Sequence, residues 1–101
     1  MSRRASKIDG NQPLIVDALR AAGCFVQSLA EVGNGCPDLL VSRAGQIFVI
    51  ELKDPTQAPS DRRLTPMQKQ WHAGWQARAH LVETVDQALL VVGAIKASRA
   101  A

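Results

Sequence analysis

The chain has 101 residues, of which 47% are hydrophobic, and a formal net charge of +3 at pH 7. This length and hydrophobic content predict one small globular domain, residues 1–101, and exclude a disordered chain. Two cysteines, Cys24 and Cys36, are too few for a disulfide framework and lack metal-ligand spacing, which indicates reduced thiols. The longest apolar run, residues 88–92, is far shorter than the roughly 20 residues of a membrane span, so no membrane partner is expected.

The two ends of the chain carry no apolar pattern, and we expect residues 1–9 and 95–101 to be flexible tails. The N-terminal segment lacks the apolar core of a signal peptide, which predicts a cytoplasmic protein. Its basic side chains, Arg3 and Arg4, suit either a solvated tail or an arm that contacts phosphates.

The first predicted element is a helix that ends at Gly23 as a C-cap. Asp9, Asn11 or Gln12 caps its start, and Pro13 lies in its first turn. One apolar stripe follows i, i+3, i+4, i+7 spacing and is expected to face a core. Its members are Ile15, Ala18, Leu19 and Ala22.

Three strands are predicted next, at residues 24–29, 38–42 and 46–53, and the last two read as an antiparallel hairpin. Three charged residues lie inside this hairpin: Asp38, Glu51 and Lys53. Central strands normally exclude such charges, because desolvating an unpaired charge is costly. A divalent metal and a phosphate would supply the missing partners.

The turn decides which side chains of the hairpin share a face. A two-residue loop, Ala44-Gly45, and a four-residue loop over residues 43–46 give the same ladder, in which Asp38 lies directly opposite Glu51. We favour the four-residue loop, because Ala-Gly is a poor two-residue turn. A three-residue loop would instead shift the ladder by one residue and separate the two carboxylates across the sheet.

A polar loop is predicted after the hairpin, at residues 54–63, and its end carries Arg62 and Arg63. The sequence Thr-Pro-Met-Gln at residues 65–68 is a capping-box pattern with Pro at the first helical position, so a second helix begins there. The side chains expected to contact DNA phosphates are Arg3, Arg4, Arg62, Arg63 and Lys69.

The second helix has one apolar stripe, formed by Met67, Trp71 and Trp75, and an adjacent polar stripe, formed by Gln68 and His72. We expect the tryptophans in the core or in a dimer interface rather than as base-stacking platforms. His72 is expected to be structural or to face DNA, and Gln68 either only completes the capping box or also serves the site.

Residues 79–83 are predicted to form a short strand, and a second capping-box pattern at residues 84–87 precedes a last helix. The order is therefore helix, three strands, helix, strand, helix. This order predicts an α/β sandwich with a mixed sheet, in which the second helix is the crossover that makes the last strand parallel to its neighbour.

The charged residues of the hairpin suit metal chemistry. Mg²⁺ takes oxygen ligands and is typically held by one or two carboxylates together with a substrate phosphate. Asp38 and Glu51 would supply carboxylates, and the Leu52 carbonyl is a further oxygen. Lys53 would orient the attacking water or stabilise charge on the phosphate. Gln68 would position a water or a phosphate oxygen.

Pro37-Asp38, followed after twelve residues by Glu51-Leu52-Lys53, matches the PD-(D/E)XK nuclease signature. Three longer stretches make the likeness more specific: GCPDLLV at residues 35–41, ELKD at 51–54 and LTPMQ at 64–68. With these stretches the chain resembles the virus-type replication-repair nuclease (VRR-NUC) family over roughly residues 11–93.

The resemblance implies a restriction-endonuclease-like αβββαβ core, with a mixed sheet flanked by helices. It also implies a Mg²⁺-dependent DNA endonuclease in which Mn²⁺ can substitute and no small-molecule cofactor takes part. Free-standing phage-type members act as homodimers on four-way junctions. Branched DNA, a homodimer and the cytoplasm of a bacterium or phage-infected host are therefore expected.

One position departs from the family. The resemblance places a glutamate on the first helix, facing the metal, where this chain has Gln12. An amide oxygen can accept a coordination bond but brings no charge, which would weaken binding of a second metal or of any metal. Asp9 and Glu31 are acids that could substitute, but no motif matches them.

Two other readings stay open at this point. The first is a catalytically weak or inactive DNA-binding module on a nuclease fold, which Gln12 motivates. The second is a protein-interaction or toxin-like phage accessory factor. Metal-dependent cleavage of a junction separates the enzyme from the inactive module, whereas weak, salt-insensitive DNA binding would favour the accessory factor.

Overall fold

The computed structural model describes residues 10–76 and 78–96. The elements in chain order are α1 (Gln12–Ala21), β1 (Phe25–Ser28), β2 (Leu39–Arg43), β3 (Gln46–Leu52), η1 (Pro59–Arg62), α2 (Pro66–Gly74), β4 (Ala79–Val82) and α3 (Val85–Val91). The predicted α/β fold, an αβββαβ core followed by a helix, is confirmed. The 3₁₀ helix η1 was not expected, because its segment was predicted to be loop throughout. The predicted tail residues 1–9 and 97–101 lie outside the described residues.

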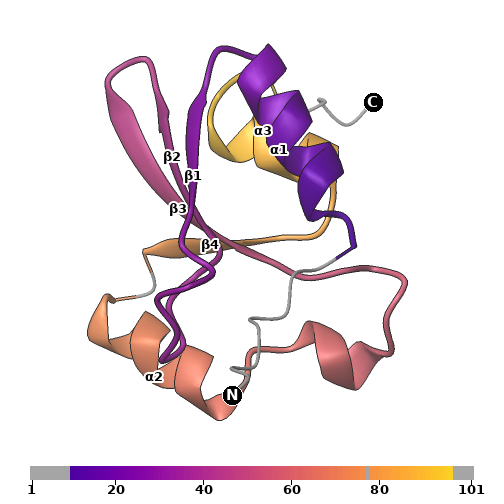
Figure 1. Cartoon of the computed structure of the whole chain (residues 1–101), viewed down its shortest axis with the longest axis vertical. Helices are drawn as coiled ribbons and strands as arrows, with labels where there is room; N and C mark the ends of the chain where they lie inside the picture. Colours follow the sequence, from indigo (N-terminus) through magenta and orange to yellow (C-terminus); the bar gives the residue numbers. More distant parts are fainter. Residues whose placement is uncertain (1–9, 77, 97–101) are drawn as a thin grey trace.

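The strands of the described chain form one mixed sheet in the order β1-β2-β3-β4. β2 is antiparallel to both β1 and β3, whereas β4 is parallel to β3. α2 lies in the connection from β3 to β4, so it is the predicted crossover helix. Figure 1 shows α1 and α3 together on one side of β4 and α2 on the other side.

The hydrophobic core lies between one face of the sheet and the pair of helices α1 and α3. Ile15 and Leu19 of α1 and Ala88 of α3 are fully buried there. Each large side chain that is buried contributes roughly 1.5–3 kcal/mol. The fully buried strand residues on this face are Leu39, Val41, Ile50, Leu52 and Val82. This core fixes the ends of β2 and β3, where Asp38 and Glu51 lie.

The opposite face of the sheet is largely open. Phe25, Ser42 and Ile47 lie in one row across β1, β2 and β3, and Phe25 and Ile47 are 81% and 69% exposed. Because side chains alternate along a strand, Glu51 projects from the same face as Ile47. The charged residues of the hairpin therefore lie on the face that α1 and α3 do not cover.

The ladder between β2 and β3 has the predicted register, but the predicted loop length is wrong. Arg43 pairs directly with Gln46, so the loop has two residues rather than four. Ala44 and Gly45 have φ values of 51° and 81°, the two positive values that a type I′ turn requires.

Arg43 supplies the physical reason for the tighter turn. Its guanidinium donates to the backbone carbonyls of Ala22 and Val92, at 3.2 and 3.3 Å. These are the C-cap residues of α1 and α3, whose last carbonyls lack helical partners. The contacts hold Arg43 in the ladder and extend β2 by one residue beyond the predicted end.

The helix caps agree with the sequence in part. Gly23, with φ of +90°, ends α1 as predicted, and Thr65 forms the full capping box with Gln68 at the start of α2. The box predicted for α3 is half formed. Thr84 accepts from the Gln87 N–H, but the Gln87 side chain accepts from the N–H of the residue before Thr84.

No helix in the described part of the chain combines the length and the apolar character needed to cross a membrane. The cytoplasmic location stays a prediction.

Candidate active site

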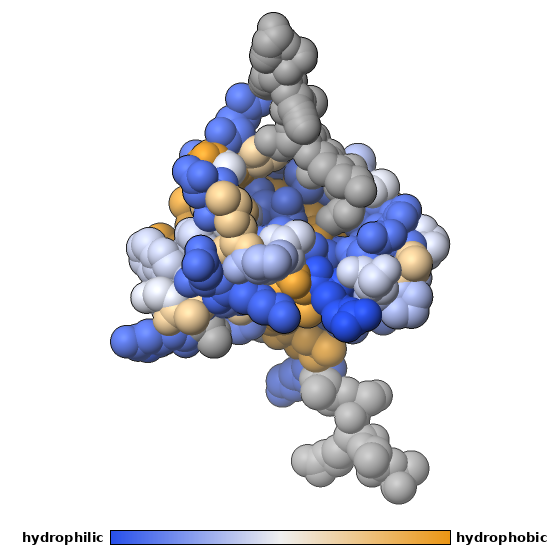
Figure 2. Space-filling model, turned by 90° about the horizontal axis from the view of Figure 1, so that it is seen from below, coloured by the Kyte–Doolittle hydropathy of each residue, from blue (hydrophilic) through white to orange (hydrophobic). Residues whose placement is uncertain are grey.

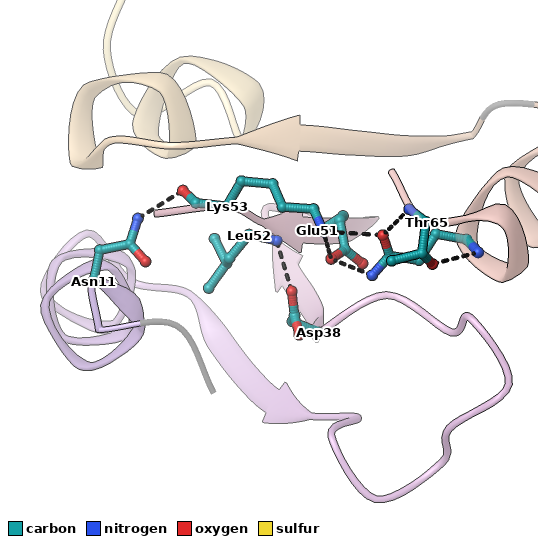
Figure 3. Close-up of polar contacts among 7 residues, drawn as sticks. Asn11, Asp38, Glu51, Leu52, Lys53 and Thr65 are labelled. Carbon is teal, nitrogen blue, oxygen red and sulfur yellow. Dashed lines mark hydrogen bonds and ion pairs between the residues drawn. The ribbon is translucent and has the colours of Figure 1, made fainter. Parts of the chain in front are cut away.

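Asp38 directly precedes β2 and is fixed to β3 by two hydrogen bonds with the backbone of that strand. Its N–H donates to the Ile50 carbonyl at 3.0 Å, and its Oδ2 accepts from the Leu52 N–H at 2.7 Å. Figure 3 shows the Asp38 carboxyl turned toward β3. The side chain is therefore held at the end of the hairpin by the neighbouring strand.

Glu51 and Lys53 project from the end of β3 on the same face as Asp38, as the ladder predicts. They are nearly buried, with 2% and 7% exposure, and Lys53 Nζ lies 3.7 Å from Glu51 Oε2. In Figure 3 the long Lys53 side chain runs back along the strand toward Glu51. At this burial an ion pair needs additional hydrogen bonds to offset its desolvation cost.

Gln68 supplies those hydrogen bonds. Its Nε2 donates to Glu51 Oε2 at 3.0 Å, and its Oε1 accepts from Lys53 Nζ at 2.9 Å. Oε1 also accepts from the Thr65 N–H at 2.8 Å, which is one half of the capping box. Because Oε1 faces two donors, the amide can take only this orientation, with its NH₂ group toward Glu51. The capping box therefore fixes the orientation of Gln68 beside Glu51 and Lys53, and its role in the site stays a prediction.

These side chains line one pocket of about 300 Å³. A second hollow of about 270 Å³ adjoins it and shares Asp38, Thr65 and Gln68. The first pocket is lined by Asp38, Glu51, Lys53, Ser60, Asp61, Arg63, Thr65 and Gln68. Ser60 and Asp61 were not singled out in the sequence, and Thr65 was noted there only as a helix cap. The capping box was the one signal that could have indicated Thr65.

The pKa of the Asp38 carboxyl is raised above its usual value by burial. The Leu52 N–H, the Glu51 carboxyl and the Lys53 ammonium lower this pKa, but by less than burial raises it. A cation bound beside the two acids would favour the ionised form. Cys36 lies close by, and burial together with the charges of Glu51 and Asp38 raises the pKa of its thiol. Cys36 is therefore not set up as a thiolate nucleophile.

No family model and no curated protein matches the chain. Among solved structures the chain is similar to one described as "VRR_NUC domain". The two share 29% sequence identity and a TM-score of 0.58, over 79% of this chain and 88% of that chain. The chain has the fold of a VRR-NUC domain. The resemblance seen in the motifs is confirmed, and the similarity indicates a function in the nuclease family.

Gln12, which was predicted to lie near the position of the family glutamate, is the first residue of α1 and is buried. Its Oε1 is buried and has no hydrogen-bond partner within residues 10–76 and 78–96. It does not line either of the two pockets beside Asp38. The described residues include no cluster of three or more His, Cys, Asp or Glu that could hold a metal.

Asn11 was expected only to cap the first helix, but its side chain instead binds two backbone carbonyls far along the chain. Its side chain makes no cap hydrogen bond and instead donates to the carbonyls of Lys53 and Glu83, at 3.0 and 2.8 Å. Figure 3 shows its amide reaching the end of β3. Asn11 therefore ties the start of α1, and with it Gln12, to the strand that carries the site. Sequence reasoning missed this role because the two contacts span 42 and 72 residues.

The predicted phosphate-binding residues are dispersed. Arg63 lines the pocket, whereas Arg62 pairs with Glu83 at 3.7 Å. Lys69 is exposed on α2. Arg3 and Arg4 lie outside the described residues.

Gly35 brings the loop before Asp38 against the start of α2. A Cβ on Gly35 would lie 2.6 Å from the Met67 carbonyl carbon and 3.0 Å from the Gln68 backbone nitrogen. Only a residue without a Cβ permits this approach, and its φ of +80° also favours glycine. Gly35 therefore sets the distance between the Asp38 loop and the helix that carries Gln68.

Proposed function

We propose that the protein is a metal-dependent DNA endonuclease that hydrolyses phosphodiester bonds and prefers branched DNA such as four-way junctions. One observation carries the proposal. Two acids, the half-buried Asp38 and the buried Glu51, share a pocket with a lysine and a glutamine that bind Glu51. A buried, hydrogen-bonded arrangement of this kind is a costly way to build a stable core, which favours a functional role.

The oxygen donors at the end of the hairpin fit a hard divalent cation. Asp38 and Glu51 would hold it, with the Leu52 carbonyl and the unpartnered amide oxygen of Gln12 as further donors. When bound, Mg²⁺, or Mn²⁺ in its place, supplies positive charge that polarises the scissile phosphate and favours deprotonation of the attacking water. Mg²⁺ sites commonly use one or two carboxylates together with a substrate phosphate, which is what Asp38 and Glu51 would provide.

Lys53 brings a positive charge next to Glu51 in the pocket. Its ammonium donates to Gln68 Oε1 at 2.9 Å and lies 3.7 Å from Glu51 Oε2, and its three donor hydrogens allow a further bond to a phosphate oxygen or a water. A donor placed beforehand beside the reacting phosphate stabilises charge that develops there without reorganisation. Gln68 acts as a positioning residue, because it binds Lys53 and Glu51 together.

The substrate class is tested with labelled duplex, flap and four-way-junction DNA, each incubated with Mg²⁺, Mn²⁺ or EDTA. Cleavage that requires metal and favours a branched substrate supports the proposal. Metal-dependent cleavage of all three at equal rates would remove the structural preference.

A second candidate is a DNA-binding module that has lost turnover. The residue that favours it is Gln12, an amide near the place where the sequence resemblance implies an acid. Tight junction binding without cleavage in Mg²⁺ or Mn²⁺ would select this candidate over the enzyme.

Gln12→Glu should tighten binding of Mn²⁺, because it adds a charged oxygen ligand at nearly constant volume. An increase of roughly 10-fold or more in affinity is expected, as for other changes near a metal site. Calorimetric titration of the folded variant measures it without relying on activity. Unchanged or weaker affinity would place Gln12 outside the metal shell.

DNA binding should weaken steeply with salt, because phosphate contacts release counterions. Replacing both Arg62 and Arg63 with Ala should lower the slope of log K against log[salt] by up to about two. Arg63 is expected to contribute more to this slope than Arg62, because Arg62 is already paired with the Glu83 carboxylate. Arg20→Ala, a basic side chain on α1, is the matched control. If wild type and the double variant have the same slope, the loop that carries Arg62 and Arg63 does not contact DNA phosphates.

The working form is proposed to be a homodimer, since two symmetric cuts in a four-way junction need two sites. The open sheet face around Phe25 and Ile47, with an apolar hollow of about 280 Å³, is its candidate contact surface. Light scattering should give twice the chain mass of 10.9 kDa at micromolar concentration, and Ile47→Asp should return it to the monomer. A wild-type monomer, with and without junction DNA, would refute the dimer.

A further inference from the structure

Two large apolar side chains of α2 lie in solvent. Gln68, Trp71 and His72 form the side of α2 that faces the rest of the protein, and His72 is buried. Met67 and Trp75, at the two ends of the helix, are 55% and 60% exposed. Large apolar side chains are normally placed inward, so their exposure indicates that this surface has a partner.

The two tryptophans form a stack. The rings of Trp71 and Trp75 lie 5.0 Å apart at an interplanar angle of 13°. Trp71 is half-buried and also meets His72 edge-on, so it supports the exposed Trp75 from within. Nearly parallel stacking is the geometry in which nucleic-acid bases contact aromatic side chains.

Basic residues flank this stack along the chain. Lys69 lies on α2 before Trp71, Arg78 follows Trp75 by three residues, and no Asp or Glu stands between Asp61 and Glu83. Figure 2 views the molecule from the α2 end and shows a mostly hydrophilic face broken by small hydrophobic areas. A partner that is both anionic and aromatic fits this surface. A second copy of α2 would instead bring like charges together.

The stack is continuous with the pocket. α2 starts at the pocket, where Thr65 and Gln68 lie, and Met67 lines the adjoining hollow. Trp75 is seven residues beyond Gln68, which is roughly 10 Å along a helix axis. A DNA strand whose phosphate occupies the pocket can therefore reach Trp75 within a few nucleotides.

We propose that Trp75, supported by Trp71, stacks on an unpaired base of the bound DNA strand. This inference rests on the proposed nuclease function and names the feature of branched DNA that the protein selects, which is an unstacked base beside the cut. In a paired duplex every base face is already stacked, so contact with Trp75 would not increase the affinity for duplex DNA.

Intrinsic fluorescence reports directly on the stack, because the chain has two Trp and no Tyr. In EDTA, where cleavage cannot interfere, oligothymidine should quench the emission, whereas an abasic strand with the same number of phosphates should not. Equal quenching by both strands, or none by either, would overturn the proposal. A spectral shift that depends on protein concentration without DNA would assign the face to self-association and would also overturn it.

Affinity provides the second measurement. Trp75→Ala should weaken binding to a junction with unpaired bases by about 5- to 150-fold, while Trp75→Phe should retain most of it. Leu14→Ala, an exposed apolar side chain on α1, is the matched control. Equal affinity of Trp75→Ala and wild type would overturn the proposal. If the protein shows base-dependent quenching but cuts no DNA, the nuclease function is refuted while the stacking of Trp75 on a base is supported.

Discussion

Glu51→Gln should reduce DNA cleavage at least roughly 100-fold while junction binding stays largely intact. The substitution keeps the side-chain volume but removes the charge of one of the two proposed metal-binding acids in the pocket. It also removes the charge that faces Lys53 at 3.7 Å in a nearly buried pair. Loss of a single preorganised charge stabiliser at a reacting centre costs about 10²–10³ in rate. Cleavage rate and binding affinity should therefore separate in this variant.

Asp17→Asn is the matched control, because it removes one exposed negative charge from α1, away from the pocket. It should cut DNA like the wild type. A circular-dichroism melt shows whether Glu51→Gln stays folded, since breaking a buried pair can cost about 3–5 kcal/mol. Undiminished cleavage by folded Glu51→Gln would refute the site. Lys53→Ala, judged in the same way, tests the other half of the pair.

Gly35→Ala should damage both stability and cleavage. The added Cβ would approach the Met67 carbonyl carbon to 2.6 Å, and neither backbone can yield without moving α2. Overpacking of this kind costs about 1–3 kcal/mol. The displacement would carry Gln68 away from Glu51 and Lys53, and a shift of about 1 Å can cost roughly 100-fold in rate.

Gly33→Ala separates the steric effect from backbone strain. Gly33 has a similar φ of +72°, but a Cβ there would meet nothing within 4 Å. Alanine is strained by the positive φ at both positions, but only at position 35 does its Cβ also clash with α2. Urea unfolding should therefore show a larger loss of folding free energy for Gly35→Ala than for Gly33→Ala. Equal stability and equal cleavage in the two variants would show that the Gly35 contact does not control α2.

The register of the hairpin could be predicted from the sequence because it depends on residues that are close together along the chain. Alternation along β2 and β3 together with the Gly45 turn defined the ladder, and that ladder brought Asp38 opposite Glu51. The element order and the capping box of α2 followed in the same way. The turn itself was missed, because the contacts of Arg43 with the ends of α1 and α3 come from distant parts of the chain.

The orientation of α2 could not be read from periodicity. The pattern identified an apolar stripe and a polar stripe, but not which one faces the protein. The polar stripe faces inward because Gln68 must reach Glu51 and Lys53. Trp75 is 60% exposed, so it does not lie in the core of this chain, and the alternative of a dimer interface stays a prediction. His72 is buried, which agrees with a structural role rather than with a DNA-facing one. The catalytic and metal-binding roles of the site residues stay predictions.

The most direct test of the nuclease proposal compares wild type with Asp38→Asn on a labelled four-way junction. Both proteins are purified in parallel and followed over time in Mg²⁺ and in EDTA. We predict defined shorter strands from the wild type in Mg²⁺ alone, and none from Asp38→Asn. Identical products from Asp38→Asn, or no products from folded wild type in either Mg²⁺ or Mn²⁺, would contradict the account.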